Sequence, residues 1–291
     1  MKLIKKFLEI SRKEALRKMA FGLTDVGKDR QVNEDYFIIK PEKHLFIVAD
    51  GMGGHNAGDI ASLNATTIAN SFLTEEVIKQ IKGDNRKIRD TIIKSLLHAH
   101  DRILEMAENN PQYEGMGCTI VVALILNNNL HLCHVGDARA YLANENGLTL
   151  LTRDHSYVME LVQKGKMTME EARVSPMKNK LNQAIGASKS INPDYKHFEL
   201  REDDKILLCS DGLWDMISDP QIEAILKLNK PVQKMCEILI KIANDAGGHD
   251  NITAVIIHHK DQSADELEHL DEQEINVLEK TGEYSFVFKD Q

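Results

Sequence analysis

Hydrophobic and polar positions follow two different periods along the chain, and the period changes from segment to segment. Short apolar runs rich in β-branched residues predict strands, whereas longer runs with an apolar position every three or four residues predict helices. We expect strands at residues 36–39, 45–49, 119–126, 130–135, 138–143, 205–209 and 252–258. We expect helices at residues 56–73, 86–108, 155–165, 168–173 and 232–246, the last with Pro231 near its start.

The connections between these elements indicate the fold class. Residues 119–126 and 130–135 form a clear hairpin around Asn127-Asn128-Asn129, and residues 144–147 form a further turn. Hairpins dominate the centre of the chain, and the long helices come in separate pairs. This order favours an α+β fold of antiparallel sheets flanked by helices over a doubly wound parallel sheet.

The two ends of the chain differ in charge from the centre. Residues 1–20 carry a net charge of +5, and residues 2–19 have the pattern of a basic amphipathic helix. This helix would either pack on the domain or contact an acidic membrane surface or partner. Residues 261–291 carry a net charge of −8 and form an acidic extension, which would either pack on the core or regulate it. We therefore expect one domain over residues 21–260.

Composition excludes several classes of protein. The formal net charge of −9 argues against nucleic-acid binding, and the 42% of hydrophobic residues suffice for a sizeable core. The four cysteines form no Cys-x-x-Cys pair, which favours a reducing compartment and no zinc site. The longest apolar run, residues 120–126, is too short to span a membrane, and lysines interrupt any signal peptide. We expect a cytoplasmic protein without a transmembrane segment.

Acidic residues stand at the ends of several predicted strands. Asp50, Asp137 and Asp211 each follow an apolar strand directly, and Asp35 and Asp250 precede two others. Carboxylates gathered at one edge of a sheet would repel one another and raise one another's pKa values. Divalent cations resolve that repulsion, and oxygen ligands without a His or Cys cluster suit Mg²⁺ or Mn²⁺.

Each Asp taken alone has another explanation. Asp-Gly pairs are common in turns, so any one of these residues could be a turn former. Five acids beside five strands favour a shared metal site over five separate turns. The chain has no EF-hand loop, and the glycine-rich segment at residues 50–55 lacks the Lys of a nucleotide-binding loop.

Taken in order, these residues resemble the motifs of the metal-dependent serine/threonine phosphatases, the type 2C class, in the form found in its bacterial branch. Seven ordered motifs between about residue 20 and residue 258 carry the resemblance: Thr24-Asp25-Val26-Gly27 with Arg30 and Asn33-Glu34-Asp35; Asp50-Gly51-Met52-Gly53-Gly54-His55; Gly117-Cys118-Thr119; Val135-Gly136-Asp137-Ala138-Arg139; Leu151-Thr152-Arg153-Asp154-His155-Ser156; Ser210-Asp211-Gly212-Leu213-Trp214-Asp215; and Asp250-Asn251-Ile252-Thr253. Such a set is far more specific than a single glycine-rich loop.

The resemblance implies a four-layer αββα sandwich with metals at one edge, and it implies a role for each acid. Asp50 would bridge two cations, and the Gly51 carbonyl would bind one of them. Asp211 and Asp250 would hold one cation, and Asp35 would serve the other. Asp137, with Asp211 or Asp215, would form a third, weaker site. Arg30 would grip the substrate phosphate with its planar guanidinium.

The implied mechanism is direct attack on phosphorus by a water that two cations activate. Asp50, Asp211 and Arg30 would then be the catalytic residues. Met52 stands where many eukaryotic members have His, which removes one protein-borne general acid. Ala138 and Asn182 also depart from the common pattern, but neither replaces a predicted metal ligand.

Two histidines and one segment are further candidates. His55 and His155 could act as acids, although loop histidines of this kind are more often structural. Residues 157–180 resemble the mobile flap of the family, with Gly165 and Pro176 as hinge candidates. This flap could influence which protein docks at the site.

The expected activity is hydrolysis of phosphoserine and phosphothreonine in proteins, opposing a cognate Ser/Thr kinase. Two other hypotheses stay open at this point. One is a catalytically silent relative that binds phosphoproteins or a partner, and the presence of every predicted ligand argues against it. The other is a phosphatase of small phosphate esters, which a deep closed pocket would favour.

Overall fold

The computed structural model describes residues 19–53 and 57–260. The basic amphipathic helix expected at residues 2–19 lies outside the described residues, apart from Met19. His55 and the acidic extension at residues 261–291 also lie outside them. The predicted division at residues 20 and 260 therefore stays a prediction.

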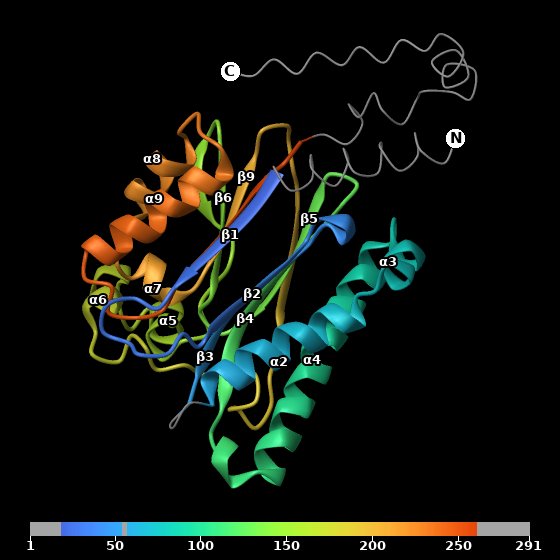
Figure 1. Cartoon of the computed structure of the whole chain (residues 1–291), viewed down its shortest axis with the longest axis vertical. Helices are drawn as coiled ribbons and strands as arrows, with labels where there is room; N and C mark the ends of the chain where they lie inside the picture. The colour runs from blue at the N-terminus through green and yellow to red at the C-terminus, as the bar shows by residue number, and fades with distance from the viewer. Residues whose placement is uncertain (1–18, 54–56, 261–291) are drawn as a thin grey trace. The chain divides into compact units, whose positions relative to one another are not determined.

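Ten strands form two antiparallel sheets in the described part of the chain (Figure 1). The first sheet has the order β1 (Ala20–Asp25), β10 (Ile252–His258), β9 (Lys205–Cys209), β6 (Arg139–Asn144) and β7 (Gly147–Leu150). The second has the order β2 (Asp35–Lys40), β3 (Leu45–Met52), β4 (Gly117–Leu126), β5 (Asn129–Val135) and β8 (Asp194–Glu199).

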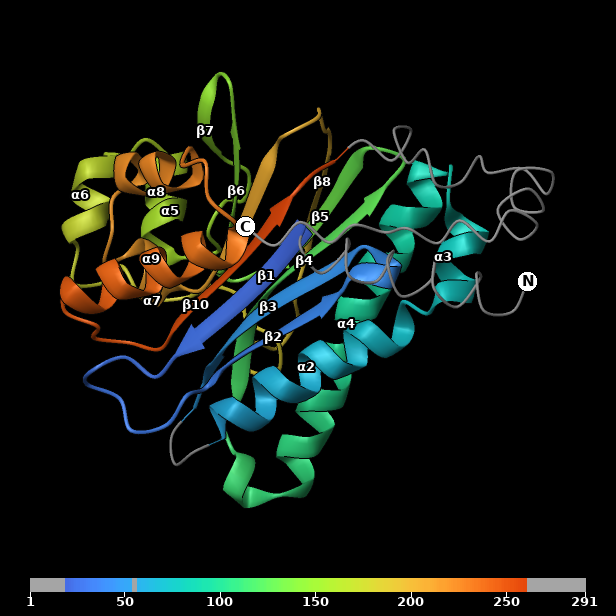
Figure 2. The ribbon, with the colours of Figure 1, turned by 45° about the horizontal axis from the view of Figure 1, so that its top comes forward.

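Helices cover the outer face of each sheet (Figure 2). The second sheet packs against α2 (Gly58–Phe72), α3 (Glu75–Ile81) and α4 (Asn85–Asn109). The first packs against α7 (Asp211–Trp214), α8 (Asp219–Leu226) and α9 (Val232–Asp245). The flap, residues 157–180, carries α5 (Tyr157–Gln163) and α6 (Met169–Val174), and short 3₁₀ turns occupy η1 (Pro41–Lys43) and η2 (Pro111–Tyr113).

Alternating side chains divide the core into three layers. On β3, Leu45 and Ile47 pack against the helices, whereas Phe46 and Val48 pack against the other sheet. This period of two follows from the pleat, which sends successive side chains to opposite faces. The inner layer joins both sheets, and the outer layers join each sheet to its helices. The predicted four-layer αββα sandwich is therefore confirmed.

Several predicted elements match the structure closely, and others were missed. The strands at residues 205–209 and 252–258 have the predicted bounds. The hairpin turn uses Asn127 and Asn128, both with positive φ, as a two-residue turn requires. The missed elements are β1, β7, β8, α3, α7 and α8. The polar sequence of β8, Asp-Tyr-Lys-His-Phe-Glu, explains one omission, because this strand lies at the edge of its sheet and is only partly buried.

Within the described ranges, no helix has both the length and the apolar character needed to cross a membrane.

Candidate active site

The inner layer of the sandwich ends in polar side chains at one edge. On β3 the inward positions run from Phe46 through Val48 to Asp50. Asp35 on β2 lies directly opposite Asp50, and Thr119 on β4 lies opposite it on the other side. Cross-strand partners share one face of a sheet. The pleat that builds the apolar core thus also brings these polar groups together.

The two sheets meet at Asp35. Its Oδ2 accepts hydrogen bonds from Ser210 Oγ at 2.7 Å and Thr253 Oγ1 at 2.6 Å, both from the opposite sheet. Its Oδ1 is buried and has no hydrogen-bond partner. Burial, together with the charges of Asp211 and Asp250, raises the pKa of Asp35 to about 8 despite these two hydrogen bonds.

A second group of carboxylates surrounds the start of α7. Asp211 is the first residue of this helix, and Asp215 follows one turn later. The indole Nε1 of Trp214 donates to the carbonyl of Asp137 at 3.1 Å, which ties the segment after β5 to the same helix. Burial raises the pKa of Asp211 to about 6, and the charge of Asp250 is the second largest cause. Burial and the charge of Asp211 also raise the pKa values of Asp50 and Asp137.

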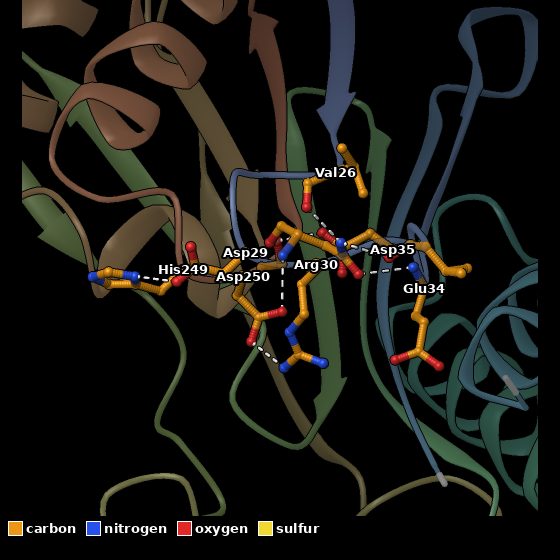
Figure 3. A network of polar contacts seen from close by, with 10 residues as sticks. Val26, Asp29, Arg30, Glu34, Asp35, His249 and Asp250 are labelled. Carbon is orange, nitrogen blue, oxygen red and sulfur yellow. Dashed lines mark hydrogen bonds and ion pairs between the residues drawn. The ribbon is translucent and has the colours of Figure 1, made fainter. Parts of the chain in front are cut away.

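Arg30 and Asp250 form the outer part of the site (Figure 3). Arg30 Nη2 donates to Asp250 Oδ2 at 2.9 Å, and the side chains are 48% and 34% exposed. Asp29, the neighbour of Arg30, pairs with His249, the neighbour of Asp250, at 2.6 Å. This ion pair and the adjacent hydrogen bond therefore hold the loop at residues 26–34 beside the segment that precedes β10.

Gly51 is required by close backbone packing. A Cβ at this position would meet the Gly58 carbonyl oxygen at 2.2 Å and the Glu34 carbonyl oxygen at 2.5 Å. The Gly51 N–H donates to that Glu34 oxygen at 3.1 Å. The glycine after Asp50 thus lets β3, α2 and the loop at residues 26–34 converge at the acidic edge.

Two residues that the sequence analysis did not assign belong to this site. The Asn251 side chain accepts from the Glu34 N–H at 2.8 Å and donates to the carbonyls of Val26 and Val32, both at 2.9 Å. The Glu34 carboxyl lies near Arg30 and Asp59, and its partial burial raises its pKa. Both residues stand inside motifs named in the sequence analysis, Asn33-Glu34-Asp35 and Asp250-Asn251, and this position could have identified them.

We predict that Asn251→Ala will lower the free energy of unfolding by about 3 kcal/mol, because each of the three lost hydrogen bonds of this buried side chain is worth about 1 kcal/mol. Urea denaturation in the presence of a chelator measures the loss. Asn109→Ala is the control, since its hydrogen bond to Glu105 is exposed. A loss no larger than that of the control would contradict the role assigned to Asn251.

The donor set fits divalent cations. Asp35 Oδ1 and Asp211 Oδ1 are both buried without a hydrogen-bond partner, and such atoms are costly unless something binds them. Oxygen ligands of this kind suit Mg²⁺ and Mn²⁺. In the described residues no three of these carboxylates bring ligand atoms within 4.8 Å of one another.

A different group, His134, His155 and Asp194, does bring potential ligand atoms within 4.8 Å of one another. His155 Nδ1 accepts from the Gly136 N–H at 3.3 Å, so the ring proton lies on Nε2, which faces Asp194 at 3.6 Å. The rings of His134 and His155 stack at 4.7 Å, and His134 Nε2 bonds the Arg153 carbonyl. His155 Nε2 is buried without a hydrogen-bond partner, and burial lowers the pKa values of both histidines.

Comparison with known proteins defines the class. An αββα sandwich whose inner faces end in clustered carboxylates has the architecture of the metal-dependent phosphatases that the motifs resemble. Residues 27–254 match the protein phosphatase 2C family. The chain is 36% identical over 246 residues to the protein phosphatase PhpP of Streptococcus pneumoniae, an alignment that covers 84% of this chain and 98% of the relative.

Solved structures agree with this relationship. The serine/threonine phosphatase of S. agalactiae superimposes with a TM-score of 0.76 at 37% identity, covering 82% of this chain and 99% of that one. The catalytic domain of the phosphatase PstP, in complex with two manganese ions, superimposes with a TM-score of 0.71 at 32% identity, covering 83% and 98%. The chain belongs to the protein phosphatase 2C family of metal-dependent enzymes.

Proposed function

We propose that this enzyme removes phosphate from phosphoserine and phosphothreonine in proteins. One observation carries the proposal: five Asp side chains from both sheets gather at one edge, where burial raises the pKa values of four of them, with Arg30 beside them. Its relatives include proteins named serine/threonine phosphatases, which supports the same activity.

We propose that Asp50 serves both principal cations, that Asp211 and Asp250 hold one of them, and that Asp35 serves the other. The Gly51 carbonyl would bind one of the two. Asp137, Asp211 and Asp215 would form a third, weaker site. When bound, Mn²⁺ or Mg²⁺ supplies positive charge that acidifies water and stabilises the charge of the transferred phosphoryl group. Ser210 and Thr253 fix the Asp35 carboxyl through Oδ2 and leave Oδ1 available for this task.

Arg30 is proposed to bind the phosphate of the substrate. Its guanidinium is about half exposed and pairs with Asp250 through one nitrogen, so donors remain for a phosphate oxygen. Residue 52 is Met and cannot protonate the leaving alkoxide. The leaving alkoxide therefore takes its proton from a group other than the side chain of residue 52.

The wider role follows from the activity. We propose phosphorylated proteins as substrates, a cognate Ser/Thr kinase as the opposing enzyme and the cytoplasm as the location. Purified protein offered a phosphothreonine peptide should release phosphate with Mn²⁺ and should release none after chelation. Peptide binding without metal-dependent release would instead indicate a silent binding module.

We predict that Arg30→Ala will lower kcat/KM for a phosphopeptide about 100-fold, because a charge-assisted contact to phosphate is lost. Stability should change by less than about 1 kcal/mol, since the ion pair with Asp250 is exposed. Steady-state kinetics and urea denaturation check the two parts. Arg89→Ala, which removes an exposed ion pair on α4, is the control. Unchanged kinetics in Arg30→Ala would remove Arg30 from the substrate site.

A further inference from the structure

A lysine of the flap lies against the acidic edge. Lys178 Nζ donates to both carboxylate oxygens of Asp215, each at 2.7 Å, and the two side chains are only 33% and 27% exposed. Two tight turns present this lysine, in which the Lys178 N–H donates to Ser175 and the Lys180 N–H donates to Met177, both at 3.1 Å. The contact is therefore well formed and half-buried, unlike the exposed ion pairs on the helices.

Asp215 shares its position with the predicted metal ligands. It lies one helical turn after Asp211, and residues four apart project from the same face of a helix. The charges of Asp215 and Asp211 act on each other, as do those of Asp211 and Asp137. The Lys178 ammonium therefore pairs with one of the carboxylates proposed to form the third cation site.

We propose that Lys178 is a tethered cation that competes with a divalent cation for Asp215, so that docking of the flap and filling of the third site oppose each other. This inference rests on the third site of the proposed function. One carboxylate bound through both oxygens by an ammonium has few acceptors left for Mn²⁺. Linkage is reciprocal. A cation bound at Asp215 therefore disfavours docking of the flap by the same free energy by which the docked flap disfavours cation binding.

A second ion pair on the flap supplies a matched control. Arg173 on α6 lies 3.7 Å from Asp219 on α8, and both side chains are exposed. This pair also joins the flap to the α7–α8 region, but Asp219 is not among the groups that act most strongly on the pKa of Asp211, whereas Asp215 is. Both contacts border one groove of about 440 Å³, whose lining also includes Arg139, Met159 and Trp214. Removing Arg173 should loosen the flap only slightly and should leave the Lys178–Asp215 pair in place.

The test measures Mn²⁺ binding to the full-length protein by calorimetry, together with cleavage by a Glu-specific protease at Glu170 and Glu171 in α6. The weakest Mn²⁺ site of Lys178→Gln should bind the ion about five- to tenfold more tightly than that of the unaltered protein, because the competing positive charge of the lysine is gone. Arg173→Gln should strengthen this binding much less than Lys178→Gln does, because its exposed ion pair holds the flap only weakly and Lys178 stays beside Asp215. Millimolar Mn²⁺ should accelerate cleavage of the unaltered protein and of Arg173→Gln, but not of Lys178→Gln.

The outcomes separate this inference from the proposed function. An unaltered protein that binds no Mn²⁺ tightly would overturn the metal site itself. If the unaltered protein binds Mn²⁺ tightly but the weakest Mn²⁺ binding step has the same affinity in Lys178→Gln, only the role of Lys178 would be overturned. The same conclusion would follow if none of the three proteins showed a weaker binding step. Equal acceleration of cleavage by Mn²⁺ in all three proteins would also overturn it.

Discussion

Asp50→Asn is expected to lower kcat by about 10³-fold or more and, at the same time, to stabilise the metal-free protein. The carboxylate stands where the inner face of β3 reaches the acidic edge, and its pKa is raised by burial and by the charges of Asp211 and Asp35. An amide keeps the shape, removes the buried charge and can donate to the Asp211 carboxylate. The gain in the free energy of unfolding should be about 1–3 kcal/mol.

Opposite signs of the two effects make this variant informative. Phosphate release from a phosphothreonine peptide with saturating Mn²⁺ measures the loss, and urea denaturation in a chelator measures the gain. Asp101→Asn on the exposed face of α4 is the control and should change neither quantity. Asp50→Asn protein that was inactive but also destabilised would point to a structural carboxylate instead of a metal ligand.

The sequence was sufficient to place the acidic edge because local patterns determine it. Asp35, Asp50 and Asp250 each lie beside a strand whose apolar run is clear in the sequence, and the hairpins dictate antiparallel sheets. Strands paired in this way bring their polar ends to a common edge, so the acids at strand ends mark the candidate site.

The sequence was not sufficient to predict which neutral groups support the acids. Ser210 and Thr253 donate to Asp35 across 175 and 218 residues, and nothing in a hydroxyl's local sequence announces such a partner. The pairing of Lys178 with Asp215 depends on two turns inside the flap, whose charged residues also have many other possible partners. Side-chain partners of this kind emerge only when the two sheets and the flap are assembled.

A raised pKa in the folded state also has a thermodynamic consequence for the protein without metal. The carboxyl of Asp35 binds its proton up to about pH 8 when folded, but only to its ordinary value of 3.8 when unfolded. The folded state therefore holds more protons between these limits, and stability falls as pH rises through this range. Asp50 and Asp137 act in the same direction, and Asp211 does so up to about pH 6.

The buried histidines oppose this trend at lower pH, and this fixes the window for the experiment. Burial lowers the pKa of His134 to about 4 and that of His155 below 6.5, so their contribution to stability grows with pH only until about 6.5. Between pH 6.5 and 8 the carboxyls dominate. Metal-free protein should lose about 1.4 kcal/mol per pH unit for each carboxyl that still holds a proton in the folded state.

Urea denaturation at pH 6.5, 7.25 and 8 in a chelator, with Mn²⁺ in a parallel series, measures this slope. The metal-free protein should become less stable as pH rises, and Asp35→Asn should reduce the slope because it removes the group with the pKa of about 8. With saturating Mn²⁺ the slope should flatten or reverse, since cations then occupy the carboxylates in place of protons and bind better as protons leave. Metal-free stability that rose with pH across this window would mean that the carboxylates are already compensated by the protein itself, and the acidic edge would then have no need of a cation.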